Sequence, residues 1–139
     1  MIIKGWWLIG LDNGIEIKRN EKSMSIYDKI KRFEKIWDKE HEYDFEVLYY
    51  RKCWNLRSLI AGCIGGIYDN GNTPMEREYI PKIIQALKSL NEENWDDEGG
   101  SIWTYEEQKP YIKQHIKNLK YLYRLMGKYD LDVYFYDSY

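Results

Sequence analysis

The sequence is poor in the residues that build metal centres and covalent cross-links. Only two of its 139 residues are cysteines, and only two are histidines. His41 and His115 belong to no HExxH motif, and no CxxC or CxxxH spacing occurs. Cys53 and Cys63 fall in one predicted helix with their Cα atoms about 15 Å apart, which is too far for a disulfide. We therefore expect no metal centre, no cofactor, no disulfide and no catalytic residues.

Long apolar runs and a strong net charge are also missing. No segment approaches the roughly 18 apolar residues that a membrane span requires. The N-terminal residues lack the basic, apolar and cleavage regions of a secretory signal. The net charge of −2, from 21 basic and 23 acidic residues, gives the whole molecule no attraction to DNA or to a membrane surface. The sequence predicts a cytoplasmic protein with no membrane association.

The composition is that of a folded protein rich in aromatic residues. Hydrophobic residues make up 44% and charged residues 32%, which excludes general disorder. Tyrosine is especially frequent, with 14 residues, beside 6 tryptophans. The length suits one hydrophobic core, and no linker, repeat or low-complexity tract marks a boundary. We expect a single domain over residues 1–139.

Both ends of the chain have the alternating pattern of β-strands. Residues 2–11 are strand-like, Asp12-Asn13-Gly14 is a tight-turn signal, and residues 15–18 alternate, which together predict a β-hairpin. Residues 131–136 alternate as well and predict a half-buried strand. The expected fold is α+β, with a small antiparallel sheet from the N-terminal hairpin and the C-terminal strand, packed with about four helices.

Four helices are predicted between these ends. The first begins after Ser23 or Ser25, and the second covers residues 45–62 and stops at Gly65-Gly66. The third begins at the capping-box pattern of residues 73–76, with a kink or fresh start at Pro81, and the fourth covers residues 104–126. Helical spacing places the following apolar residues in the core: Ile26, Ile30, Phe33, Trp37, Ile83, Ile84, Leu87 and Leu90.

Basic residues gather on one side of the last predicted helix. At about 100° per residue, six of them fall within roughly a 100° arc: Lys109, Lys113, Lys117, Lys120, Arg124 and Lys128. Tyr111 falls on the opposite side, with the apolar residues expected to pack. This basic face is either solvated, paired with acidic residues of this chain or of a second copy, or bound to nucleic acid or an acidic partner. The candidate contact residues are Lys113, Lys117, Lys120, Tyr121 and Arg124, with Tyr121 stacking on a base.

An acidic loop precedes this helix. Residues 91–101 have no apolar periodicity, and aromatic residues flank their carboxylates. Tryptophan and tyrosine beside charges are frequent in protein interfaces. The candidate partner-binding residues are Trp95, Asp96, Asp97, Glu98, Trp103 and Tyr105. A divalent cation on the three carboxylates is the alternative use of this loop.

Three fragments carry a resemblance to known proteins. They are Gly10-Leu11-Asp12, then Tyr50-Arg51-Lys52 with Trp54 and Leu56, and the aromatic ending of residues 134–139. In order and approximate spacing the chain resembles small uncharacterised proteins of bacteriophage and prophage genomes. The resemblance implies a phage-type accessory protein without catalytic residues, and such proteins often bind and block host machinery.

The function that follows from these observations is binding without catalysis. We expect a phage-type protein that inhibits a bacterial defence effector, such as a CRISPR nuclease, by stoichiometric binding. The alternative is a nucleic-acid-binding accessory protein that uses the basic face of the last helix. An enzyme based on carboxylates and a metal is a third class, centred on Asp96 and Asp97.

Overall fold

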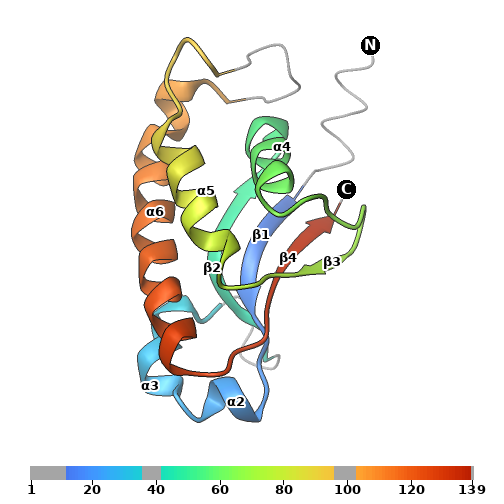
Figure 1. Ribbon diagram of the computed structural model, residues 1–139, viewed down its shortest axis with the longest axis vertical. Helices are drawn as coiled ribbons and strands as arrows, with labels where there is room; N and C mark the ends of the chain where they lie inside the picture. Colours follow the sequence, from blue (N-terminus) through green and yellow to red (C-terminus); the bar gives the residue numbers. More distant parts are fainter. Residues whose placement is uncertain (1–11, 36–41, 96–102, 139) are drawn as a thin grey trace.

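Four strands form one antiparallel sheet in the computed structural model, which describes residues 12–35, 42–95 and 103–138 (Figure 1). The strands are β1 (Asp12–Ile17), β2 (Phe45–Arg51), β3 (Asn72–Pro74) and β4 (Val133–Ser138), in the spatial order β2-β1-β4-β3. β1 and β4 are neighbours, with Ile15 opposite Phe135. The predicted antiparallel sheet that joins the N-terminal and C-terminal strand regions is therefore confirmed, and its other two strands, β2 and β3, come from the middle of the chain.

Helices cover one face of this sheet, so the α+β fold class is confirmed (Figure 1). The three longer helices are α4 (Trp54–Cys63), α5 (Tyr79–Lys88) and α6 (Tyr105–Lys128), and α5 packs against both of the others. Short helices α2 (Glu21–Met24) and α3 (Tyr27–Ile30) and the 3₁₀ turn η1 (Lys31–Phe33) lie near one end of α6.

One hydrophobic core lies between the sheet and the helices. Alternate residues of β1 and β4 point into it, because successive side chains of a strand face opposite ways. The helices contribute residues spaced three or four apart, which lie on one side of a helix. Fully buried members include Ile15, Ile17, Phe135, Ile80, Ile83, Leu119 and Leu122.

The turn predicted at Asp12-Asn13-Gly14 is wrong, because these residues belong to β1. Asn13 is buried, and its amide donates a hydrogen bond to Asp137 on β4. At Gly14 a Cβ atom would lie 2.6 Å from both the Leu48 carbonyl oxygen and the Tyr136 ring. Glycine is needed here because the neighbouring strands pack too closely for a side chain, and not because a turn requires it. The first strand of the predicted hairpin, residues 2–11, lies outside the described residues.

The helix predicted over residues 45–62 is wrong in its first half, which forms β2. A bulge causes the error. Ile15 pairs with Leu48 and Glu16 pairs with Glu46, so Val47 is an extra residue on β2. Val47 and Leu48 are both buried, and this break in the alternation imitates helical spacing. The second half forms α4, after Lys52 with a φ of 54°.

The predicted stop after α4 is confirmed. Gly65 and Gly66 have φ values of 78° and 115°, a region that L side chains rarely adopt. The Gly66 amide donates a 2.9 Å hydrogen bond to the Ala61 carbonyl, as in a Schellman C-cap. Cys53 and Cys63 lie at the two ends of α4 and are not joined by a disulfide.

The first predicted helix is divided into α2, α3 and η1, and its N-cap is Asn20, which precedes both predicted serines. Ile26, Ile30 and Phe33 are buried as predicted. Trp37 lies outside the described residues.

The capping box predicted at residues 73–76 is wrong, and the one at residues 104–107 is confirmed. Thr73 and Pro74 belong to edge strand β3. An edge strand can contain proline, because one of its sides has no neighbouring strand to which a backbone amide must donate. α5 begins at Tyr79 and has Pro81 in its first turn, as a fresh start. In α6 the Thr104 hydroxyl accepts from the Glu107 amide, and the Glu107 carboxylate accepts from the Thr104 amide.

Candidate binding surfaces

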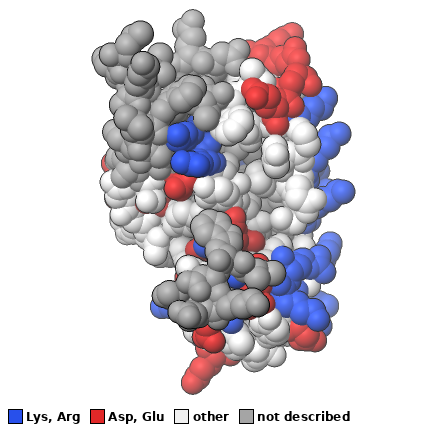
Figure 2. Space-filling model, turned by 180° about the vertical axis from the view of Figure 1, so that it is seen from behind, with Lys and Arg blue, Asp and Glu red and all other residues white. Residues whose placement is uncertain are grey.

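The basic face runs along α6, and all six of its cationic side chains are exposed. Figure 2 shows Lys and Arg side chains along the right-hand edge of the molecule, where α6 runs. From Lys109 to Lys128 the row extends about 28 Å at the usual helical rise. Lys109 lies near Glu92. Within residues 12–35, 42–95 and 103–138, the other five form no ion pair with a carboxylate.

Tyr121 borders this face but is already engaged by the protein. Its hydroxyl donates a 2.6 Å hydrogen bond to the Lys29 carbonyl, and its ring lies 6.0 Å from the ring of Phe33. The Arg32 guanidinium lies 4.1 Å from the ring centroid, a cation–π distance. The ring face under Arg32 is therefore not available to stack on a base. Arg32 instead adds a further exposed cation beside the basic face.

The aromatic residues beside the acidic loop fasten α6 to the rest of the fold. Trp95 is 5% exposed, and its indole donates a 3.0 Å hydrogen bond to the Trp103 carbonyl. The Trp103 indole donates in turn to the Arg51 carbonyl, at 2.7 Å. Trp95 is thus a core residue, whereas Trp103 and Tyr105 remain partly exposed. Asp96, Asp97 and Glu98 lie outside the described residues.

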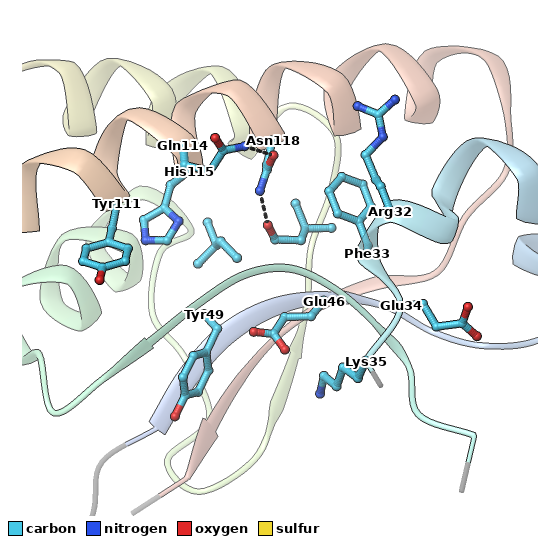
Figure 3. Close-up of a pocket in the computed structure, with 12 residues that line it drawn as sticks. Arg32, Phe33, Glu34, Lys35, Glu46, Tyr49, Tyr111, Gln114, His115 and Asn118 are labelled. Carbon is cyan, nitrogen blue, oxygen red and sulfur yellow. Dashed lines mark hydrogen bonds between the residues drawn. The ribbon is translucent and has the colours of Figure 1, made fainter. Parts of the chain in front are cut away.

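A groove of about 400 Å³ lies between β2 and α6 (Figure 3). β2 is an edge strand, so its outer side faces α6 without a further strand. A second hollow of about 180 Å³ shares Tyr49 and Tyr111 with the first. The polar and aromatic residues lining the groove are Tyr111, Gln114, His115 and Asn118 from α6, Glu46 and Tyr49 from β2, Arg32 and Phe33 from η1, and Glu34 and Lys35, which follow η1.

Side chains occupy part of the outer edge of β2. The Asn118 amide donates a 2.9 Å hydrogen bond to the Val47 carbonyl and accepts one from Gln114, also at 2.9 Å. Further along, the Arg51 carbonyl accepts from Trp103. An added β-strand needs such carbonyls for its own ladder. These bonds therefore disfavour strand addition at this edge.

His115 lies in the wall of the groove and is 7% exposed (Figure 3). Its Nε2 atom is buried and has no hydrogen-bond partner among the described residues. Burial lowers the pKa of His115 to about 4, so the imidazole is neutral at physiological pH. This histidine is therefore packed in the wall of the groove and is not an exposed base. Tyr111, placed on the packing side from the sequence, is 62% exposed at the mouth of the groove.

The buried imidazole makes stability depend on pH. Unfolded chains bind a proton at His115 near pH 6.5 and the native protein only near pH 4, so stability falls as the pH drops through this window. Between pH 7 and pH 5 we expect a loss of about 2 kcal/mol in unfolding free energy. Urea titrations of the wild type and His115→Leu at both pH values measure it. An equal loss in the variant contradicts the assignment.

A second polar cluster lies on the sheet face opposite the helices, and sequence reasoning missed it. Buried Glu16 forms an ion pair with Lys35. The Tyr134 hydroxyl bridges Glu16, at 2.8 Å, and Asp44. Burial and these two carboxylates raise the pKa of Tyr134. In the part of the chain that the structure describes, no group of three or more His, Cys, Asp or Glu side chains is arranged to hold a metal ion.

A buried ion pair joins α4 to β4, also unforeseen. Asp137 accepts two hydrogen bonds from the Arg57 guanidinium, at 2.8 and 2.9 Å. The Asn13 side chain and the Asn70 amide donate to the same carboxylate. Burial alone would raise the pKa of Asp137, but these donors outweigh it and hold the pKa below its ordinary value. Residues distant in sequence are brought together, so no local pattern could reveal the pair.

On the residues that the structure describes, the basic face and the groove beside it are the two candidate binding surfaces. No helix of the described residues is both long and apolar enough to cross a membrane. Scans of protein families and searches of curated proteins and solved structures found no match to this chain.

Proposed function

We propose that this protein acts by binding and not by catalysis, and that the basic face of α6 contacts the phosphate backbone of nucleic acid. The observation that carries the proposal is the row from Lys113 to Lys128, whose five exposed cations have no carboxylate partner among the described residues. Lysine and arginine side chains that neutralise phosphates supply most of the affinity of non-specific nucleic-acid binding.

The spacing of the row favours a bound polyanion over a merely solvated face. Lys113 and Lys117 lie four residues apart, as do Lys120 and Arg124, and Arg124 and Lys128. Like charges at this spacing destabilise a helix by a few tenths of a kcal/mol per pair. A row of phosphates would replace this repulsion by attraction. The local charge is opposite in sign to the net charge of −2, so binding would be confined to this face.

Salt dependence tests the proposal. If the five cations contact phosphates, the logarithm of the association constant should fall with the logarithm of salt concentration with a slope of about −4. The double variant Lys117→Gln/Lys120→Gln should reduce the slope by about 2. Fluorescence anisotropy with a labelled oligonucleotide, titrated at several salt concentrations, measures both slopes.

A matched control carries the same change of charge elsewhere. Lys82 and Lys88 are exposed on α5, so Lys82→Gln/Lys88→Gln removes two positive charges away from the basic face. We expect this variant to keep the wild-type slope. Equal slopes in the two double variants, or no oligonucleotide binding at low salt, would overturn the proposal.

A phage-type inhibitor of a bacterial defence effector is the second candidate, and the charge arrangement favours it. Exposed carboxylates cluster where α6 begins, where Glu106 raises the pKa of Glu92 through a side-chain hydrogen bond. The molecule therefore presents both signs of charge to a protein partner along one helix. Co-purification with an effector and its stoichiometric inhibition would support this function. Full effector activity at saturating protein, across a panel of CRISPR and other nucleases, would exclude it for that panel.

A further inference from the structure

The groove adjoins the basic face on the same helix. In angle around the axis of α6, Gln114 and Asn118 lie next to the arc of the basic residues. Tyr111 and His115 lie further round the helix, on the same side. All four line the groove (Figure 3). A nucleic-acid strand whose phosphates contact the basic face can therefore direct neighbouring groups into the groove while it remains bound to α6.

The groove offers an aromatic surface at its mouth. Tyr111 is 62% exposed and is one of three large hydrophobic side chains that are exposed among the described residues. No hydrogen bond or ring contact holds it within that part of the structure. Every nucleobase has a flat π-face, and stacking on an exposed aromatic side chain contributes about 1–3 kcal/mol per base.

The wall of the groove offers hydrogen bonds. The buried Nε2 of His115 has no partner among the described residues, and an unsatisfied buried polar atom costs about 1–3 kcal/mol. A neutral imidazole can donate from one nitrogen and accept at the other. The exposed Gln114 amide lies one residue away. The Gln114 amide can pair with the edge of a base directly, whereas the His115 Nε2 atom becomes available to a base once the side chains that cover it move.

From this geometry we infer that the groove between β2 and α6 accepts an unpaired base of single-stranded nucleic acid whose phosphates lie along the basic face. The inference rests on the proposed function and names its substrate class. A base within a duplex cannot enter, because its edge is paired and its faces are stacked. An extended peptide is the less favoured occupant, because Asn118 and Trp103 already bind the β2 carbonyls of Val47 and Arg51.

The test compares single-stranded and duplex binding. Wild-type protein should bind labelled oligothymidylate more tightly than a duplex of the same length at the same salt concentration. Tyr111→Ala should weaken single-strand binding by about ten- to a hundredfold and leave duplex binding within about twofold. Tyr111→Phe, which keeps the ring, should retain the single-strand affinity.

Tyr68→Ala is the matched control, because Tyr68 is 65% exposed and lies outside the groove. It should change neither affinity. If Tyr111→Ala leaves single-strand binding unchanged, or weakens both substrates equally, the groove inference is overturned while the basic face keeps its function. If wild-type protein binds neither oligonucleotide at low salt, the proposed function fails, and the groove inference fails with it.

Discussion

Replacing Asp137 with asparagine is expected to lower the free energy of unfolding by about 3–5 kcal/mol, which is the usual cost of breaking a buried ion pair from one side. The Asp137 side chain is fully buried and accepts from Arg57, Asn13 and the Asn70 amide. Asparagine keeps the size but removes the negative charge. The Arg57 guanidinium, 14% exposed, then loses its buried charged partner, while its ion pair with Asp69 lies at the surface.

The matched control for this prediction is Asp132→Asn. Asp132 forms an ion pair with Lys22, but both side chains are about half exposed, and exposed pairs contribute at most about 1 kcal/mol. Guanidinium denaturation of both variants measures the difference. A shift for Asp137→Asn no larger than the shift for Asp132→Asn would show that the buried pair contributes little to stability.

The same carboxylate should contribute to acid sensitivity. The folded pKa of Asp137 lies below its ordinary value, so its stabilisation is complete above the unfolded pKa of about 3.9. It is lost as the pH falls from there through the folded pKa. The Asp137→Asn variant should therefore lose less stability than the wild type on acidification below pH 4.

Gly14→Ala is expected to destabilise the protein by about 2–3 kcal/mol, the usual cost of forcing an extra group into a packed core. The new Cβ would lie 2.6 Å from the Leu48 carbonyl oxygen, which belongs to the backbone of β2 and cannot rotate away. The Tyr136 ring, on the other side, lies equally close. Relief therefore requires β1 and β2 to separate.

The control is the same substitution in a place with room for it. At Gly62, in α4, an added Cβ would meet no atom within 4 Å. Alanine there should stabilise the protein by about 0.5–1 kcal/mol, because glycine is a poor helix former. Thermal unfolding of the two variants should show shifts of opposite sign. Shifts of the same sign would contradict the close packing at Gly14.

The sequence predicted the features that depend on local chemistry. The capping box at Thr104 and the glycine stop after α4 formed because their partners lie within a few residues. The alternation of residues 131–136 also predicted β4 correctly, since Val133 and Phe135 face the core. Nothing local revealed that β1 lies in the middle of the sheet.

The errors arose where a partner distant in sequence decides the local structure. Asn13-Gly14 has the composition of a turn, yet Asp137 and Leu48 determine its place in a strand. The bulge at Val47 exists only because β1 pairs beside it. Tyr111 was placed on the packing side from its helical angle, but α6 extends along a groove there. For the candidate site, the sequence predicted the basic face and missed the groove.

The pairing of β1 with β4 also determines when this protein can fold during its synthesis. The ribosome makes β1 first among the described strands and β4 last, although the two are hydrogen-bonded side by side. Until residues 133–138 emerge, β1 lacks one neighbour and β3 has no strand to pair with. The nascent chain must therefore keep its apolar strands in solution until β4 has been made and has emerged, which lengthens its exposure to aggregation and to chaperones.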